Sequence, residues 1–267
     1  MEYQKFIPEG WEETKEEFNM LQLKSAFDEG KVMQGFVGKC DENYNLHIQL
    51  GNNITGILPR NELEAVDIDE YGFCKTSICK NKVNQFVQFK IKEIYDEDKV
   101  LLSRKSVQKE ALEWVTRDLV PGIVIKGVIK NIRQYGVFVE IGGGIVGLLH
   151  IEDISISRIK TPEERFYIGQ KINVMIKSID KENNKIVLSY KELLGNWEEN
   201  IQDYQEKMIV KGIVKEPDKF KNGIFIELKP NLVGLAEYKE GLEYGQKVDV
   251  YIKKIIKDRK KIKLLIV

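Results

Sequence analysis

The chain has 267 residues with 42 basic and 42 acidic side chains, so its formal net charge is zero, and hydrophobic residues make up 42% of it. This composition is typical of globular proteins, and no apolar run approaches the ~20 residues of a membrane-spanning helix, so we expect no membrane contact. Three cysteines and a start without the pattern of an export signal predict a reducing, cytoplasmic location.

Residues 9–27 predict an amphipathic helix, because large apolar side chains recur among Glu- and Lys-rich sequence: Trp11, Phe18, Leu21 and Phe27. The acidic residues near its start are typical of the first turn of a helix. We expect this helix, within an N-terminal segment of residues 1–27, to pack on the domain that follows. A helix that binds a partner protein is the alternative.

An internal repeat begins after this segment. Residues 37–63 align without gaps on residues 128–154, and residues 211–238 align on residues 126–151 with two extra residues in the first turn. Glycines at matching positions, Gly56, Gly147 and Gly234, give a period of 91 and then 87 residues. Repetition at that length indicates whole domains in tandem and not a solenoid.

The first copy carries a loop about six residues longer than its counterpart in the second copy, with Tyr71, Cys74 and Cys79 in it. Zinc ligands usually come in closer-spaced pairs than these two cysteines. We therefore expect no metal site here, and none elsewhere in the chain.

Two connectors separate the copies. Residues 106–117 lack Gly and Pro and predict a short helix around Trp114, and residues 194–205 form a second connector with Trp197. We expect each Trp to wedge between neighbouring domains and not to contact a nucleobase.

The second copy contains two segments of strict alternation, which predict half-buried strands. In the second of these segments, three β-branched residues mark the face that should point into the core: Val137, Val139 and Ile141. The alternating residues Gly136, Phe138 and Glu140 should then point outward.

An outward Phe138 beside Tyr135 in the turn is costly to expose unless something covers it. Cations and a histidine frame the two rings: Lys126, Lys130, Arg133 and His150. Aromatic rings among cations on a small β-sheet face are typical of stacking on nucleobases. The three glycines at 142–144 predict a hairpin turn, because the downstream helix and Lys of a phosphate-binding loop are missing.

The stretch QYGVFVEIGGGIVGLLHIEDIS, followed by YIGQKINVMIKSIDKENNKIVLSYK, resembles the RNA-binding repeat of ribosomal protein S1, which also occurs in polynucleotide phosphorylase and ribonuclease E. The resemblance covers residues 121–191 almost without a gap and implies a five-stranded antiparallel OB barrel. It places the family's stacking and contact positions at Tyr135, Phe138, His150, Asp180 and Lys185. The family more often has Phe at the first of these positions and Arg at the last.

The repeats extend this expectation to the whole chain. We expect an all-β protein of three tandem five-stranded OB barrels with short helical linkers and an N-terminal helix: residues 28–107, 118–194 and 205–267. In the third barrel Ile224, Ile226 and Leu228 should point inward and Phe225 outward, and Lys261 takes the place of Lys185.

Charge and side chains distinguish the barrels. The net charges of these three ranges are −2, +2 and +6. The first barrel also has His47 and Pro59 where the second has Phe138 and His150, so its nucleic-acid face is mostly lost. Because phosphate affinity grows with each neutralised charge, we expect RNA to follow the last two barrels.

Nothing in the sequence assembles a nucleophile, a base and an oxyanion site, so we expect neither an enzyme nor a cofactor. The sequence favours a cytoplasmic, monomeric protein that binds single-stranded RNA, messenger RNA in particular, and that acts with the ribosome in translation or its regulation. The alternative is a scaffold that docks a ribosomal protein or a nuclease, with incidental RNA contact. Duplex DNA fits poorly, because no basic recognition helix is present.

Overall fold

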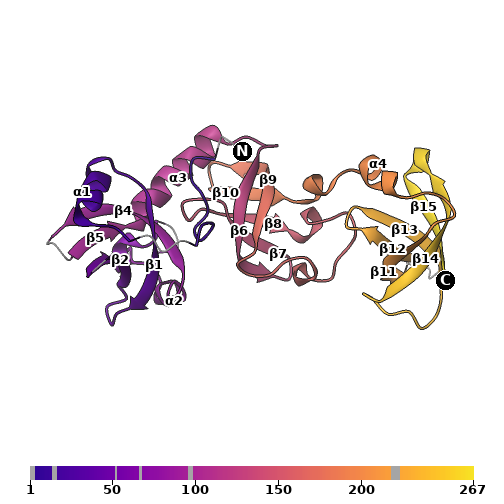
Figure 1. The fold of residues 1–267 in the computed structure, drawn as a ribbon, viewed down its shortest axis with the longest axis horizontal. Coiled ribbons are helices and arrows are strands. Elements are labelled where there is room, and N and C mark those ends of the chain that lie inside the picture. The colour runs from indigo at the N-terminus through magenta and orange to yellow at the C-terminus, as the bar shows by residue number, and fades with distance from the viewer. Residues whose placement is uncertain (1–3, 14–16, 52, 66–67, 96–98, 218–222) are drawn as a thin grey trace. The chain divides into compact units, whose positions relative to one another are not determined.

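The computed structural model describes residues 4–13, 17–51, 53–65, 68–95, 99–217 and 223–267. In them, three closed five-stranded barrels follow one another along the chain, each built from consecutive strands (Figure 1). The predicted all-β architecture of three tandem barrels is confirmed. The helices are few and short: α1 (Met20–Asp28), α2 (Thr76–Asn81), α3 (Arg104–Asp118) and α4 (Trp197–Asn200).

Each barrel has the same strand order, in which the fifth strand lies between the third and the fourth. The strands of the first barrel are β1 (Met33–Cys40), β2 (Leu46–Gly51), β3 (Ile54–Leu58), β4 (Phe86–Ile94) and β5 (Lys99–Ser103). Those of the central barrel are β6 (Val124–Arg133), β7 (Gly136–Glu140), β8 (Val146–His150), β9 (Lys171–Asp180) and β10 (Lys185–Ser189). Those of the third barrel are β11 (Ile209–Pro217), β12 (Gly223–Lys229), β13 (Leu232–Glu237), β14 (Lys247–Ile256) and β15 (Lys261–Ile266).

One pairing in each barrel departs from the expected antiparallel pattern. The third and fifth strands pair parallel, as β3 with β5, β8 with β10, and β13 with β15. The strand order explains this difference. Strands that reverse direction at each step leave the third and the fifth pointing the same way, so closing the barrel between them makes a parallel pair.

A glycine in the first strand of each barrel lets the sheet close tightly. A Cβ on Gly127 would lie 2.4 Å from a methyl carbon of Val139, and Gly35 and Gly212 face Ile48 and Ile226 in the same way, at 2.5 and 2.3 Å. Real side chains do not tolerate such contacts. The recurrent glycine therefore marks the point where the first strand crosses an inward residue of the second.

The N-terminal helix is shorter than the sequence predicts. Helix α1 begins at Met20 after a capping box between Asn19 and Gln22, and the described residues 4–13 contain no helix. Residues 17–19 are also not helical, and residues 14–16 of the expected helix lie outside the described residues. Pro8 and Gly10, whose φ is +79°, explain why the chain before Trp11 is not helical.

The two linkers place their tryptophans against apolar neighbours. In α3, Trp114 is 3% exposed and its ring centroid lies 5.8 Å from that of Phe6. In α4, Trp197 packs against the core of the third barrel.

Across the described helices, none combines the length and apolar character needed to cross a membrane.

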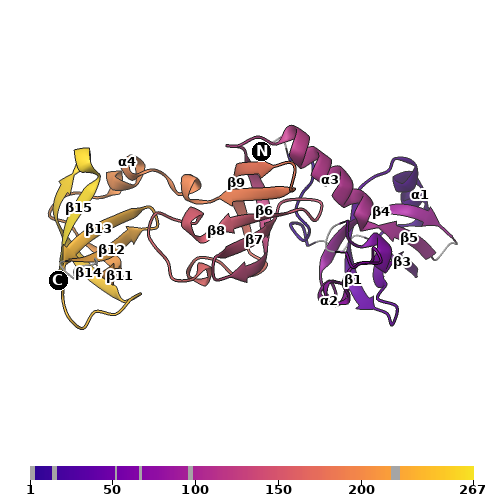
Figure 2. The same cartoon turned by 180° about the vertical axis from the view of Figure 1, so that it is seen from behind.

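The chain forms two compact units. The first contains residues 1–130, 138–147 and 168–186, and the second contains residues 131–137, 148–167 and 187–267. Figure 2 shows the barrels from behind, with α3 leading from β5 towards β6. The polar contacts described below lie within one unit or the other.

Candidate nucleic-acid interface

Strand β7 has the two faces that its alternation predicts. Val137, Val139 and Ile141 are fully buried, and Phe138 between them is only partly buried. The Phe138 ring therefore lies on the opposite side of the strand from the barrel core. A large apolar ring in this position gives the central barrel a surface on which a planar base can stack.

Two further predicted residues lie at strand ends. Tyr135 is 51% exposed in the turn before β7, and the His150 side chain is 40% exposed at the end of β8, the strand next to β7 in the barrel. The carbonyl of Tyr135 accepts a hydrogen bond of 2.9 Å from the amide of Ile151, which ties the turn to the end of β8.

The His150 ring is oriented by its own turn. Its Nδ1 accepts a hydrogen bond of 3.4 Å from the amide of Glu152, at the start of the 3₁₀ turn Ile151–Asp153. A neutral imidazole that accepts at Nδ1 carries its proton on Nε2. His150 can therefore donate from Nε2 to a base or a phosphate oxygen.

Asp180 and Lys185 lie at the two ends of the exposed hairpin between β9 and β10. The Asp180 carboxylate accepts from the side-chain and main-chain nitrogens of Asn183 and from the amide of Glu182, and these bonds lower its pKa. The Asp180 carboxylate therefore closes the hairpin turn. Lys185 is exposed at the start of β10.

The N-terminal segment covers two of the predicted lysines. The Nζ atom of Lys130 donates to the main-chain oxygen of Glu9 at 3.0 Å, and that of Lys126 lies 5.2 Å from the centroid of a Trp11 ring. Burial lowers the pKa of Lys130, although Glu9 and Glu140 oppose it. Arg133, at the far end of the same strand, is exposed.

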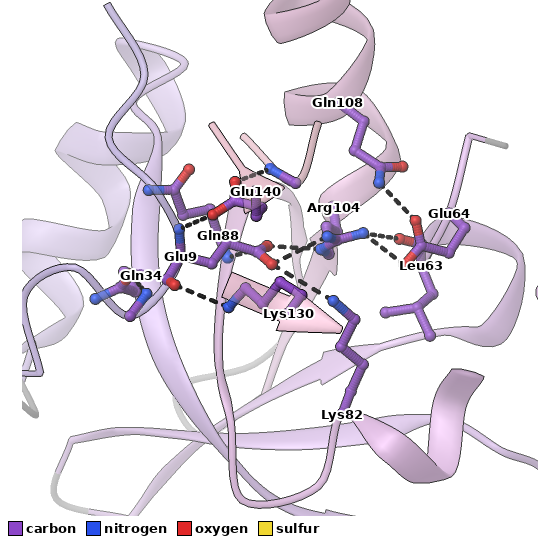
Figure 3. Close-up of polar contacts among 12 residues, drawn as sticks. Glu9, Gln34, Leu63, Glu64, Lys82, Gln88, Arg104, Gln108, Lys130 and Glu140 are labelled. Carbon is purple, nitrogen blue, oxygen red and sulfur yellow. Dashed lines mark hydrogen bonds and ion pairs between the residues drawn. The ribbon is translucent and has the colours of Figure 1, made fainter. Parts of the chain in front are cut away.

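A buried ionic cluster holds this segment in place (Figure 3). Glu9 is fully buried and forms two bonds with Arg104, from Nε at 2.7 Å and from Nη2 at 3.0 Å. Arg104 also pairs with Glu64 at 2.7 Å, and Lys82 approaches Glu9 at 3.5 Å. Burial alone would raise the pKa of Glu9, but Arg104 and Lys82 outweigh it and hold that pKa far below its usual value.

Glu140 is the clearest difference from the sequence-based expectation. We expected it on the outward face with Phe138, yet it is 1% exposed, because the N-terminal segment covers it. Its carboxylate accepts from the amides of Glu9, Gly142 and Gly144 at 2.7, 3.0 and 2.8 Å. Burial, and then the charge of Glu9, raise the pKa of Glu140 to about 7. Glu9 itself belongs to this cluster and not to the first turn of a helix.

The glycines at 142–144 form the predicted turn between β7 and β8, and all three have positive φ. The turn is packed from outside: a Cβ on Gly142 would lie 2.3 Å from the main-chain oxygen of Phe6, and one on Gly144 would lie 2.2 Å from Nη2 of Arg104. The amides of Gly142 and Gly144 donate to the Glu140 carboxylate, so the turn has a structural role.

The third barrel repeats the outward aromatic ring. Phe225 is 42% exposed between the buried Ile224 and Ile226, and Leu228 is partly buried against the same core. Lys261 is exposed at the start of β15. This barrel therefore combines an available ring with the most basic sequence in the chain.

The corresponding face of the first barrel is occupied by other contacts. His47 forms a 3.1 Å contact with Asp41, and the Tyr44 ring has Arg60 at 5.7 Å and Lys80 at 5.6 Å from its centroid. Cys74 and Cys79 are fully buried, and burial raises the pKa of both thiols. Within the described ranges, no three His, Cys, Asp or Glu side chains gather as metal ligands.

Comparison with known proteins finds a family match in the central barrel. Residues 119–191 match the S1 RNA binding domain family. The chain is 32% identical over 253 residues to small ribosomal subunit protein bS1 of Staphylococcus aureus strain COL, a match that covers 85% of this chain and 62% of that protein. The bS1 protein of Staphylococcus saprophyticus subsp. saprophyticus is 28% identical over an alignment of 281 positions. That alignment covers 96% of this chain and 69% of the S. saprophyticus protein. The chain thus spans 62% of the length of the S. aureus relative.

Among solved structures, GSP13 from Bacillus subtilis is 28% identical, with a TM-score of 0.28, over 28% of this chain and 58% of that one. A multidomain protein with nucleic acid binding domains from Streptococcus pneumoniae TIGR4 is 15% identical, also with a TM-score of 0.28, over 89% and 73% of the two chains.

Proposed function

We propose that this chain, whose residues 119–191 match the S1 RNA binding domain family, is a single-stranded RNA-binding protein that acts with the ribosome in translation or its regulation. The observation that carries the proposal is the partly exposed Phe138 on β7, on the opposite side from Val137 and Val139, within the segment that matches the family.

The mechanism follows from the side chains of the central barrel. Bases stack on Phe138 and Tyr135, the Nε2–H of His150 donates to a base edge or a phosphate, and Arg133 and Lys185 follow the backbone. Stacking depends on the π-face that every base has, so this binding tolerates many sequences. Lys126 and Lys130 are the weaker candidates, because the N-terminal segment contacts both ammonium groups.

The three barrels contribute unequally to RNA binding. The central and third barrels, residues 118–194 and 205–267, hold the strand, because each presents an outward Phe and both ranges are net positive. The first barrel, residues 28–107, contributes little to RNA affinity, because a paired His47 stands in place of the stacking ring. Asp180 shapes the hairpin that carries Lys185.

The relatives that are named as small ribosomal subunit proteins support the wider setting. Messenger RNA is the proposed strand, the ribosome is a second partner, and the protein works in the cytoplasm as a monomer. Its role is binding and not catalysis.

A second function, docking to a ribosomal protein or a nuclease, is favoured by one surface of the first barrel. Two aromatic rings in its longer loop are exposed, Tyr71 to 77% and Phe73 to 40%. Exposed aromatic side chains on a barrel whose sequence range has a net charge of −2 suit a protein partner better than a phosphate backbone.

The test compares Phe138→Ala with Tyr71→Ala in titrations of a labelled single-stranded oligonucleotide. Loss of one stacked base should weaken binding by about 1–3 kcal/mol in Phe138→Ala. Tyr71→Ala removes an exposed ring from the first barrel and should leave RNA affinity unchanged. Equal affinities of the folded Phe138→Ala variant and the wild type would refute the stacking site.

A further inference from the structure

A six-residue segment after His150, Ser155–Lys160, alternates between buried and exposed side chains although it is not a strand. Ser155 and Ser157 are 6% and 2% exposed, whereas Ile156 is 59% exposed and Arg158 is also exposed. The apolar and the cationic side chain point outward, and the two hydroxyls point inward. This is the reverse of the pattern that burial of apolar area produces.

The inward side of the segment is anchored to the third barrel. The Ser157 amide donates to the carbonyl of Pro230 at 2.9 Å, and the Ile156 amide donates to Oδ1 of Asn231 at 3.1 Å. The Ser155 hydroxyl donates to the carbonyl of Ser157 at 2.7 Å. The exposed Ile156 and Arg158 therefore stand on a fixed backbone, so a ligand that meets them does not have to order the loop.

A buried carboxylate completes the anchor. Glu227 of β12 is 3% exposed and accepts from the Ser157 hydroxyl, from Nη2 of Arg165 at 2.6 Å, and from Nζ of Lys215 at 3.1 Å. Burial alone would raise the pKa of Glu227, but its bonds with Ser157 and Arg165 lower it below its usual value. The carboxylate therefore remains charged at neutral pH and continues to hold the segment.

The segment forms one wall of a cleft of about 600 Å³, which lies within the range of small-molecule sites. Its cations, Arg158, Lys160 and Lys191, outnumber its carboxylates, Glu152 and Glu216. One lining residue, Ile151, directly follows His150 in the chain, so the cleft lies next to this proposed RNA contact.

Arg158 is the cation in this cleft that is available to a ligand. The Nζ atom of Lys160 lies 4.2 Å from the ring centroid of Tyr244, and Lys191 bonds Asp153 at 2.8 Å. Arg158 makes no hydrogen bond or ion pair with any residue that the structure describes. A free guanidinium beside an exposed apolar side chain matches a phosphate next to a base.

We propose that this cleft holds a nucleotide of the RNA strand as it leaves the central barrel past His150, with its phosphate on Arg158 and its base against Ile156. The inference rests on the proposed function and names a site for the strand outside the strand faces of the barrels. The same chemistry would suit a free mononucleotide, and we assign the site to the strand because the lining residue Ile151 directly follows His150.

The test compares a short and a long oligonucleotide on the full chain. An OB barrel occupies about 4–16 nucleotides, so an oligomer of about five nucleotides can fill the central barrel alone, and one of about sixteen also reaches the cleft. Arg158→Ala should weaken the long oligomer by about two- to tenfold, the effect of losing a phosphate contact, and should leave the short one unchanged. The slope of log affinity against log salt for the long oligomer should become shallower by about 0.7.

Arg117→Ala is the matched control, because it also removes one cation, from an exposed surface of α3, and it should change neither oligomer. Equal affinity of the wild type and Arg158→Ala for the long oligomer, or an equal loss for both lengths, overturns the cleft site.

Adenosine monophosphate should show no binding that depends on Arg158; such binding would assign the cleft to a free nucleotide and overturn the proposal. Binding of a polyglutamate peptide that depends on Arg158, with no change for RNA, would also overturn it. If the wild type binds neither oligomer, the proposed function itself fails.

Discussion

Replacing Arg104 by Met tests what the buried cluster contributes to the stability of the first unit. The Arg104 side chain is 2% exposed, makes two bonds to Glu9, pairs with Glu64, and donates to the carbonyl of Leu63 at 3.2 Å. Methionine keeps most of the aliphatic volume of arginine, so the substitution removes the charge and the hydrogen bonds with little loss of packing.

The expected loss of stability follows from the groups that remain. Removing one partner of a buried ion pair costs about 3–5 kcal/mol, because the other charge stays buried without it. Glu9 keeps Lys82 at 3.5 Å and the amide of Gln88 at 3.0 Å, so we expect the lower end of that range, about 3 kcal/mol. The double variant Glu9→Gln/Arg104→Met removes both charges and should recover at least about 1 kcal/mol.

Hydrogen exchange in residues 4–13 and 99–118 suits this measurement, because it reports local opening and three barrels do not unfold in a single two-state step. Arg117→Met, on the exposed face of the same helix, is the control and should change stability by less than about 0.5 kcal/mol. The reasoning fails if Arg104→Met costs less than about 1 kcal/mol, or if the double variant loses the full sum of the two single changes.

Three other outcomes follow from the same structure. Because the pKa of Glu140 is raised to about 7, its contribution to stability is complete below about pH 4.5 and falls as the pH rises towards 7. Glu140→Gln should remove this dependence from the opening free energy of residues 4–13, measured by hydrogen exchange at pH 5 and pH 8. RNA affinity should fall with salt at a log–log slope of about −3 to −4 if roughly four to six phosphates are contacted, and a slope near zero would mean that the lysines do not meet the backbone. Gly144→Ala should destabilise the first unit by more than Gly169→Ala does in thermal unfolding. Both glycines have positive φ, but of the two only a Cβ at position 144 would meet another group, Nη2 of Arg104 at 2.2 Å.

The barrels could be predicted from the sequence because their signals are local. Alternation over a few residues separates Val137 and Val139 from Phe138, and the spacing of glycines repeats the same strand crossing in each copy. Such patterns depend on the pleat of one strand and on its immediate neighbour, and both can be read within about thirty residues.

The polar clusters could not be predicted, because their members are far apart in the chain. Glu9 stands 95 residues before Arg104, and its acidic surroundings favour a helix start and not a buried carboxylate. Ser157 stands 70 residues before Glu227 in the cluster of the second unit. The coverage of Glu140 also has no local signal, since the strand alternation assigns it to the outward side together with Phe138.

Photo-crosslinking of the full chain to a single-stranded RNA containing 4-thiouridine, with the attached residues mapped by mass spectrometry, would locate the residues that meet the bases. We expect the principal crosslinks on the stacking residues Tyr135 and Phe138 of the central barrel, with a second group at Phe225, and we expect them to disappear when unlabelled RNA competes. Crosslinks confined to the first barrel, or crosslinks that persist in the presence of the competitor, would contradict it.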